Sequence, residues 1–522
     1  MDEVVYDLCI VGAGLIGSAA ARHATIISPA AKICLIGPKE PVNFAENPER
    51  TIFSSHYDEG RLAKTMMPDL LWAMLDNRSI SRYEGIQQQT GTRFFTDVGF
   101  MMISVKEGHQ YTSVMKDMAV KFGKKFDILD KTELTERYDY LSMRPNDEAI
   151  LELNHAGYVS GRKQVLAQQT AARQQGCDII DDIINHVTEC NQSTVDNVLK
   201  LTTHKGHIMR ARKVLLTTGA FTSFRHLLPP GKELDVTLYS KTQAFAELTP
   251  EDAKRLTDMP TIGRKYTKEG NHDLYMLPPI KYPNGKYYLK IGHGAKLNTV
   301  LNTEKEVADW FWTEGHASAH KPLLDMMFDI VKGVKPVSTH GGSCVITTTP
   351  TGHVYCDMVT PTLGVAVGGN GHGASAADEI GNMAARMIIA GKWDHDLSPD
   401  SFRIKGNKKL IIDRQIYSTS VRYRSIIQCD VLPGVKPVSA HGGSCVITTT
   451  PTGHVYCDIV TPTLRVAVGG NRHGASAADE IGIMAARMMI AWKLDQVLSP
   501  DSFSVKFKNC CDLKEKHAIG SG

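Results

Sequence analysis

The sequence predicts an α/β protein with a doubly wound domain near its N-terminus and a second, strand-rich domain, and three observations lead to this fold class. Leu8 to Val11 is a short apolar run typical of a buried parallel strand. Three glycines and a stretch of small residues with helical character follow it directly. Between residues 236 and 300, apolar runs of strand length are separated by turn residues.

The glycines are Gly12, Gly14 and Gly17, at G-x-G-x-x-G spacing. In a strand–turn–helix unit the first glycine permits the tight turn, the second lets the backbone approach a pyrophosphate, and the third lets the helix pack close to the strand. The start of the helix offers free N–H groups and the positive end of a dipole. The motif therefore predicts a dinucleotide site, with a purely structural turn as the alternative.

The second strand, Lys32 to Ile36, lacks at its end the acidic residue that usually holds the ribose of a dinucleotide. A Gly-Pro-Lys run occupies this place, and the nearest acid is Glu40. The departure argues against NAD and leaves the ribose contact of any FAD unassigned.

The composition of the chain indicates its number of domains, its kind of partner and its compartment. The chain has 522 residues, enough for two or more domains, of which 42% are apolar and 22% charged. A net charge of +3 gives no reason to expect nucleic acid or an anionic membrane as the main partner. Eleven cysteines without a C-x-x-C pair favour a reducing compartment. Because no secretory signal and no membrane-spanning apolar run is found, a cytoplasmic or peroxisomal protein is expected.

The remaining elements follow in order along the chain. A polar loop at 50–61 either lies along a cofactor or is solvated. The strand that ends at Thr218 runs into Gly219, which can bring backbone against a ligand. The Asn284–Gly285 dipeptide predicts a hairpin. Helices are expected at 68–82, 162–176 and 304–331, and strands at 94–105, 177–187, 208–218, 237–248, 274–277 and 287–292.

The C-terminal part of the chain contains a long repeat. Residues 333–402 recur as residues 434–503, an offset of 434 − 333 = 101, with 60 of 70 positions identical. Three glycines become large residues in the second copy: Gly364 and Arg465, Gly371 and Arg472, Gly391 and Trp492. We expect the first copy to complete the N-terminal sheet, and the second, with the 403–433 linker and the 504–522 tail, to lie outside the core fold. Association through the second copy, a duplicated exon and a gene-model error stay open as explanations.

Several motifs occur in a specific order: the glycine motif, Ser54–Arg61, Leu215–Phe221, Tyr287–His293, Ser343–Pro350 and Gly369–Gly373. In these motifs the chain resembles the FAD-dependent D-amino acid oxidase superfamily and, within it, the branch of monomeric sarcosine oxidase and pipecolate oxidase. The resemblance covers about residues 5–402. It implies a doubly wound, Rossmann-type FAD-binding domain interleaved with an antiparallel-sheet domain that covers the flavin and forms the substrate pocket.

The resemblance also implies domain boundaries and an activity. The FAD-binding domain would comprise 1–90, 150–225 and 333–402, and the substrate domain 91–149 and 226–332. The activity would be oxidation of the C–N bond of a secondary amino acid (N-methyl or cyclic) or related amine by hydride transfer to flavin, with O2 as acceptor giving H2O2. The protein would be a monomer or self-associate weakly through the second copy.

Four residues are implied at the site of reaction. Lys290 matches a lysine near flavin N5 that stabilises developing superoxide, and Arg61 matches an arginine over the flavin that binds a substrate carboxylate by a two-pronged contact. Tyr275 matches a pocket tyrosine, and His293 lies one place from a pocket histidine. The alternatives are a solvent-facing lysine for Lys290 and an ordinary strand histidine for His293.

Cofactor contacts are implied as well. Cys344 matches the cysteine that holds FAD through an 8α thioether, with a buried structural cysteine as the alternative. The Gly371-His372-Gly373 turn matches the loop that presents N–H groups to the flavin pyrimidine, at the start of a helix. Further contacts are implied at Ser55, His56, Val187 and Gly219, and no metal is expected.

Two departures limit the prediction. The chain has one residue more than the family between His56 and Arg61, and Ser375 stands where the family often has a lysine that pairs with the substrate carboxylate. The substrate is therefore a larger amino acid, or an amine held differently. Two other functions stay open: a dehydrogenase of the same fold with another electron acceptor, and a catalytically inactive binding or assembly protein in which the repeated segment spoils the site.

Overall fold

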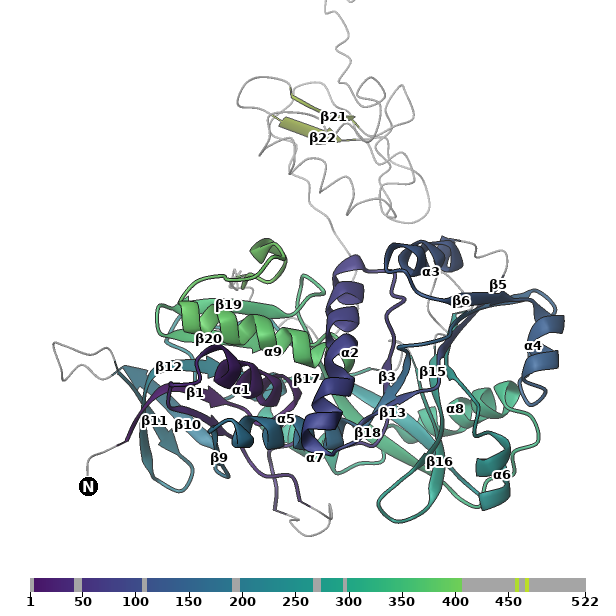
Figure 1. Ribbon diagram of the computed structural model, residues 1–522, viewed down its shortest axis with the longest axis horizontal. Coiled ribbons are helices and arrows are strands. Elements are labelled where there is room, and N and C mark those ends of the chain that lie inside the picture. The colour runs from purple at the N-terminus through teal and green to yellow at the C-terminus, as the bar shows by residue number, and fades with distance from the viewer. Residues whose placement is uncertain are drawn as a thin grey trace, which may run out of the picture. The chain divides into compact units, whose positions relative to one another are not determined.

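The computed structural model describes residues 4–41, 49–105, 110–189, 198–265, 274–293, 298–405, 456–459 and 465–468. The chain divides into two compact units, Met1–Leu410 and Ile411–Gly522. The first unit contains two large sheets, and each has a hydrophobic core of its own. Figure 1 shows these sheets with the helices that pack on them.

The first sheet is the doubly wound one that the glycine motif predicts. Its parallel centre has the order β12, β1, β2, β9, and β12 pairs along its other edge first with β11 and then with β20. The antiparallel strands β10 and β19 complete it. The bounds are β1 Val5–Val11, β2 Ile33–Ile36, β9 Asp178–Ile180, β10 Ile184–Glu189, β11 Leu199–Thr203, β12 Ile208–Leu216, β19 Tyr355–Thr360 and β20 Leu363–Val367.

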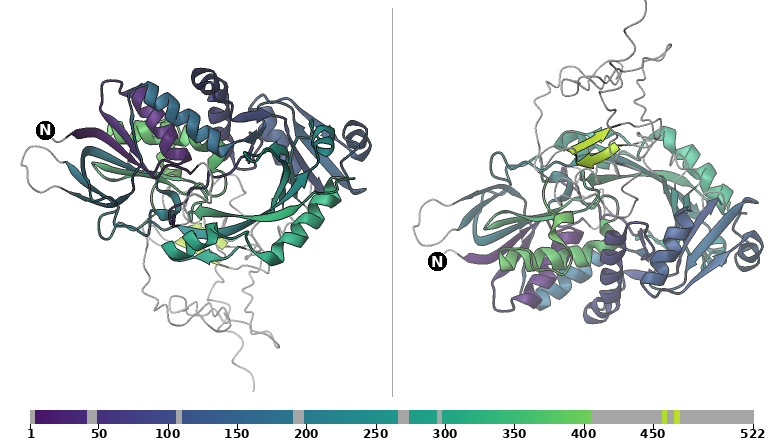
Figure 2. Two further views of the ribbon diagram at one scale, coloured as in Figure 1. Left: turned by 90° about the horizontal axis from the view of Figure 1, so that it is seen from below. Right: turned by 90° about the horizontal axis from the view of Figure 1, so that it is seen from above.

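Three helices cover one face of this sheet: α1 (Leu15–Ile27), α5 (Gly161–Gln174) and α9 (Gly373–Ala390). Because strand side chains alternate between faces, Leu8 and Ile10 pack toward the helices, whereas Cys9 and Val11 belong to the core of the opposite face. Helices α1 and α9 lie side by side, as the views in Figure 2 confirm.

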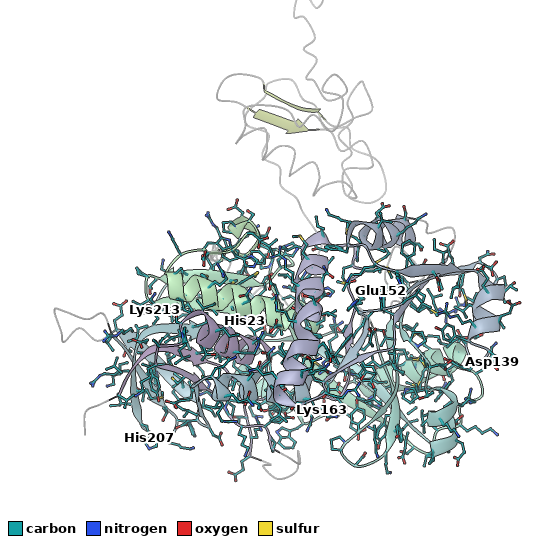
Figure 3. The ribbon with its side chains drawn as sticks, viewed as in Figure 1. His23, Asp139, Glu152, Lys163, His207 and Lys213 are labelled. Carbon is teal, nitrogen blue, oxygen red and sulfur yellow. The ribbon has the colours of Figure 1, made fainter. Side chains whose placement is uncertain are left out.

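A buried ionic network joins α1 and α9 to α2 (Leu70–Thr90). On α9, Asp378 accepts hydrogen bonds of 2.6 Å from both Arg22 and Arg82. His23, labelled in Figure 3, lies 3.2 Å from the same carboxylate. Although burial raises the pKa of Asp378, the His23, Arg22 and Arg82 side chains around it hold the pKa well below its ordinary value. The neighbouring Glu379 accepts from Arg82 at 2.5 Å.

The second sheet has nine strands in the order β17, β13, β16, β15, β14, β5, β7, β6, with β18 also paired to β13. Strands β15 and β16 form the predicted hairpin, and Gly285 in its turn has a φ of +81°. The bounds are β5 Phe100–Val105, β6 Phe126–Leu129, β7 Asp147–Glu152, β13 Thr237–Leu248, β14 Thr261–Lys265, β15 Leu274–Lys281, β16 Tyr287–His293, β17 Val300–Leu301 and β18 Thr339–Thr348.

Smaller elements complete the first unit. The strands β3, β8 and β4 form a small sheet of their own. The bounds are β3 Arg61–Ala63, β4 Phe95–Asp97, β8 Gly157–Val159, α3 Gln110–Lys121, α4 Lys131–Arg137, α6 Pro250–Arg255, α7 Glu304–Phe311 and α8 Ala317–Ile330.

The structure differs from the sequence prediction in four places. The strand expected at 177–187 is two strands, β9 and β10, which lie far apart in the first sheet because β9 pairs with β2 and β10 with β11. The helix expected at 304–331 is two helices, α7 and α8, because Gly315 between them has a φ of +85° and no room for a side chain against Thr242. Helix α2 extends to Thr90, beyond the predicted end at residue 82. Strand β18 pairs with β13, so the 333–402 segment contributes to both sheets rather than to the FAD-binding domain alone. The domain boundaries themselves stay a prediction.

In the second unit the structure describes one antiparallel hairpin, β21 (Tyr456–Ile459) with β22 (Arg465–Val468). Tyr456 pairs with Val468, which is the register of Tyr355 with Val367 in the first copy. The rest of the second copy, the linker beyond residue 405 and the tail lie outside the described residues.

Residue 364 in the first hairpin leaves no room for a long side chain. A Cβ at Gly364 would lie 3.1 Å from Met387 Cε and 3.3 Å from Ile388 Cδ1, both on α9. The second hairpin begins its strand with Arg465 at this position.

Candidate active site

A cavity of about 460 Å³ extends from the glycine motif to the sheet of nine strands. It brings together eleven of the residues that the sequence predicts for the site. They are Gly12, Gly14, Ser55, His56, Arg61, Gly219, Tyr275, Cys344, Gly371, His372 and Gly373.

The glycine motif forms one end of the cavity. Gly12 has a φ of +113°, which only glycine adopts readily. A Cβ at Gly17 would lie 1.9 Å from the carbonyl oxygen of Gly12 and 2.4 Å from Thr217 Oγ1, so the third glycine permits the close packing of α1 on the sheet. Gly14 is the N-cap of α1 and lines the cavity. The free N–H groups of the helix start thus lie where they can hold a diphosphate.

The side chain of His56 is buried at the wall of this part of the cavity. Its Nδ1 lies 2.7 Å from Ser54 Oγ, and its Nε2 lies 3.2 Å from a carboxylate oxygen of Glu40. Burial lowers the pKa of His56. Glu40, the acid nearest the end of β2, also lies 3.1 Å from Arg162 Nε, so its carboxylate is already engaged by protein groups.

Two of the predicted cofactor contacts do not line the cavity. Gly17 lies behind the motif, and Val187 lies on β10, where its N–H donates to the His226 carbonyl at 3.1 Å. Ile183 and Ile184 line the cavity instead of Val187.

The N-terminal end of α9 also lines the cavity. Gly371 has a φ of +82°, and His372 follows as the N-cap of α9. The ring centroid of His372 lies 5.1 Å from that of Trp72. Burial, with the Lys64 cation nearby, lowers the pKa of His372 to about 4, so the imidazole is neutral at physiological pH.

Cys344 is a buried thiol on β18 that faces the cavity. Its Sγ lies 3.8 Å from Arg61 Nη2. The thiol therefore lies beside a guanidinium at the cavity wall.

Lys290 lies behind the wall, on β16, and its side chain has no exposed surface. Its ammonium donates to the Gly60 carbonyl at 2.8 Å and to the carboxylate of Asp58. Burial and the nearby Arg61 cation lower the pKa of Lys290, whereas the direct contact with Asp58 favours the ammonium form. The alternative of a solvent-facing lysine is wrong.

The hydrogen bonds of Arg61 go to the protein itself. Nη1 donates to Asp58 and to the Gly60 carbonyl at 3.1 Å, and Nη2 donates to the Ser55 carbonyl at 2.8 Å. The guanidinium thus lies at the cavity, as predicted, but its two-pronged side is taken by Asp58 and backbone oxygens rather than left open for a ligand.

Tyr275 contributes a neutral phenol to the wall. Its hydroxyl accepts a hydrogen bond of 3.2 Å from Gln243 Nε2. Burial raises the pKa of Tyr275 to about 12. His293 ends β16, and its side chain lies outside the described part of the structure.

Sequence reasoning missed a polar group near α9. Lys64 and Asp76 both line the cavity, and Ser375 Oγ donates to Asp76 at 2.7 Å. Burial raises the pKa of Asp76 to about 8 and lowers that of Lys64 to about 8. Within the described residues the Lys64 ammonium has no hydrogen-bond or ion-pair partner, and it lies 4.4 Å from the centroid of the Phe100 ring.

The segment that carries Lys64 is held in place by Glu152, labelled in Figure 3. This carboxylate, at the end of β7, accepts hydrogen bonds of 3.2 Å from the backbone N–H groups of Thr65 and Met66. Its burial raises its pKa. The sequence signals for this region were the altered spacing between His56 and Arg61 and the serine at position 375.

Among the described residues there is no group of His, Cys, Asp and Glu side chains that could hold a metal ion. In the same part of the chain no helix is both long and apolar enough to cross a membrane.

Comparison with known proteins agrees with this geometry. The chain is 23% identical over 423 residues to monomeric sarcosine oxidase from Bacillus sp. (strain NS-129), covering 77% of this chain and 98% of that one. The structure of NikD, an unusual amino acid oxidase essential for nikkomycin biosynthesis, matches with a TM-score of 0.61 at 16% identity over 77% of this chain and 98% of NikD. Glycine oxidase from Geobacillus kaustophilus matches with a TM-score of 0.58 at 17% identity over the same shares.

A family profile decides the assignment. The profile described as FAD dependent oxidoreductase matches residues 7–387. The cavity fits the cofactor of this family, because one cavity is lined both by Gly12 and Gly14 at the start of α1 and by Cys344. The chain belongs to the family of FAD dependent oxidoreductases, which confirms the resemblance drawn from its motifs, and it is a flavin-dependent oxidoreductase.

Proposed function

We propose that this oxidoreductase oxidises the C–N bond of a secondary amino acid, N-methyl or cyclic, or of a related amine, with O2 as the electron acceptor and H2O2 as by-product. The observation that carries the proposal is a fully buried ammonium, Lys290, directly behind a cavity that begins at a dinucleotide motif. A buried cation of this kind is suited to stabilising negative charge that develops on reducing O2. The named relatives, which oxidise amino acids by their printed names, support the substrate class.

In this proposal the cavity residues at the starts of α1 and α9 hold FAD. Gly12, Gly14 and the start of α1 hold the diphosphate, and the Gly371-His372-Gly373 turn with the start of α9 receives the flavin. FAD supplies the acceptor for the hydride that leaves the carbon next to the amine nitrogen.

In this proposal Tyr275 orients the substrate by a hydrogen bond, and Lys64 and Asp76 offer polar groups to it. Because the pKa of Tyr275 is about 12, its hydroxyl keeps its proton near neutral pH. Among the described contacts the hydroxyl accepts from Gln243, which leaves its own proton for a ligand in the cavity.

The proposal is tested with the purified, flavin-loaded protein. Mixing without oxygen with a set of N-methyl and cyclic amino acids should bleach the visible flavin absorbance, and adding O2 should restore it and release H2O2. A protein without flavin absorbance, or one that no amine reduces, would contradict the proposal. Reduction followed by slow reoxidation would identify a dehydrogenase with another electron acceptor.

A thioether between FAD and Cys344 is part of the proposal, because this buried thiol is the cysteine at the cavity wall beside Arg61. Acid precipitation of the wild-type protein should give a yellow pellet, and the Cys344→Ser variant a colourless pellet with yellow supernatant. Cys356→Ser, a buried cysteine that does not line the cavity, is the control. A colourless wild-type pellet would show that the flavin is not covalently bound.

A further inference from the structure

A single carboxylate holds two cations together at the wall of the cavity. Asp58 is 7% exposed, and its Oδ2 accepts hydrogen bonds from both Lys290 and Arg61. Its other oxygen, Oδ1, accepts from the Tyr282 hydroxyl at 2.7 Å and from the Gly60 N–H at 3.4 Å. Both oxygens are thus used, and all of these partners are protein groups.

The position of Asp58 decides what Arg61 can bind. A guanidinium recognises a carboxylate through two parallel N–H groups. In Arg61 the two terminal NH2 groups, Nη1 and Nη2, donate to Asp58 and to the carbonyls of Gly60 and Ser55. A substrate carboxylate could bind Arg61 only by displacing a carboxylate that is already buried and held by Lys290 and Tyr282.

Charge leads to the same conclusion. Lys290 and Arg61 are two like charges near each other in a buried region, which is unfavourable without a counter-ion. Asp58 reduces the charge of this group from +2 to +1 and neutralises the wall on the side of Arg61.

We propose that Asp58 is a shared, built-in counter-ion that occupies the carboxylate-binding side of Arg61 and ties Arg61 to Lys290, so that Arg61 holds the site together and does not receive the carboxylate of the substrate. This deepens the proposed function by assigning substrate specificity: the amine is recognised without a carboxylate contact at Arg61. The inference rests on the proposed function only in taking this cavity as the substrate site.

The test measures binding of benzoate, a simple carboxylate, to the flavin-loaded protein by titration calorimetry, which needs no turnover. In the wild-type background, Arg61→Met should weaken benzoate binding by less than about threefold, the effect of losing one nearby cation rather than a two-pronged contact. Asp58→Asn should bind benzoate roughly tenfold or more tightly, because it adds one positive charge and frees the guanidinium. The double variant with Arg61→Met should lose this gain.

Glu59→Gln is the matched control, since Glu59 is the next residue and is also a buried carboxylate, but it accepts a hydrogen bond from Ser160 rather than from Arg61 or Lys290. It should bind benzoate as the wild type does. An unchanged affinity in a folded Asp58→Asn variant, shown by its melting temperature, would overturn the inference, as would a loss of about tenfold in Arg61→Met.

If Asp58→Asn does not fold, the benzoate affinity of the Arg61→Met variant tests the inference. These outcomes are independent of the proposed function, because an inactive protein that still binds FAD gives the same benzoate titrations. Failure of the amine screen with the expected benzoate results would remove the activity and leave the role of Asp58 intact.

Discussion

At the residue scale, the ammonium of Lys290 is the group on which the proposed reaction with O2 depends. It is fully buried and fixed by Gly60 and Asp58, so it needs no reorganisation as charge develops nearby. We expect Lys290→Met to slow reoxidation of the reduced flavin by O2 by about a hundredfold or more, while reduction by the amine changes little. Stopped-flow absorbance separates the two steps. Lys281→Met, an exposed lysine on the adjacent strand, is the control, and equal reoxidation rates in both variants would exclude the role of Lys290.

His372 makes the stability depend on pH. Its pKa is about 4 in the folded protein, against 6.5 as its ordinary value, so between these two pH values the unfolded chain binds more protons than the folded one. Stability therefore falls as the pH drops from 6.5 to 4, and His372 accounts for at most about 2 kcal/mol of the loss at about pH 5. Urea unfolding of His372→Gln near pH 7 and pH 5 should show a smaller loss than the wild type shows. The buried His23 and His56 act in the same direction and stay in both proteins, so an identical loss would mean that His372 contributes nothing.

The sequence predicted those site residues whose position depends on local backbone. Gly12 has positive φ within the glycine motif, whereas Gly371 and Cys344 were implied by the family resemblance; all three line the cavity. It did not predict Asp58 or Asp76, because their burial depends on elements far apart in the chain, β16 for Asp58 and α9 for Asp76. The carboxylate role implied for Arg61 was drawn from a motif alone, which says nothing of the partner three residues earlier.

At the scale of the element, the ionic network on α9 is where we expect the largest loss of stability. Asp378 is fully buried and accepts from Arg22 and Arg82, so Asp378→Asn leaves the buried Arg22 guanidinium without its counter-charge, whereas Arg82 keeps Glu379. The expected cost is about 3–5 kcal/mol of unfolding free energy, measured by urea denaturation at neutral pH. Asp394→Asn, which breaks a surface pair with Arg386, should cost less than about 1 kcal/mol. If both substitutions lower the unfolding free energy by a similar small amount, the ionic network at Asp378 does not stabilise the packing of α1, α2 and α9.

Most elements of the fold could be predicted because their signal is local. Strand β13 and the β15–β16 hairpin follow from alternating apolar residues and the Asn284–Gly285 turn. The break between α7 and α8 was not predictable from periodicity, since it depends on Gly315 lying against Thr242 of another element. The placement of β18 on β13 is likewise a long-range pairing that no local pattern encodes.

At the scale of the whole molecule, the residues that form the cavity all lie within the first unit, which ends at Leu410. A chain that ends at Lys405 should therefore keep its FAD and melt at nearly the temperature of the full chain. Flavin absorbance after gel filtration and a thermal melt check this, with a chain that ends before α9, at Asn370, as the negative control. Loss of flavin from the chain ending at Lys405 would show that the second unit takes part in the site.

The repeated hairpin has a consequence for how the chain folds. The hairpins β19–β20 and β21–β22 have nearly the same sequence. Either hairpin could therefore pair with the edge of β12 during folding. If β22 paired with β12 in place of β20, the first sheet would contain the wrong strand. Arg465 would then occupy the position of Gly364. Its guanidinium would be forced against the apolar side chains of Met387 and Ile388, which pack closely on that position. The change from glycine to arginine would therefore disfavour pairing of β22 with β12.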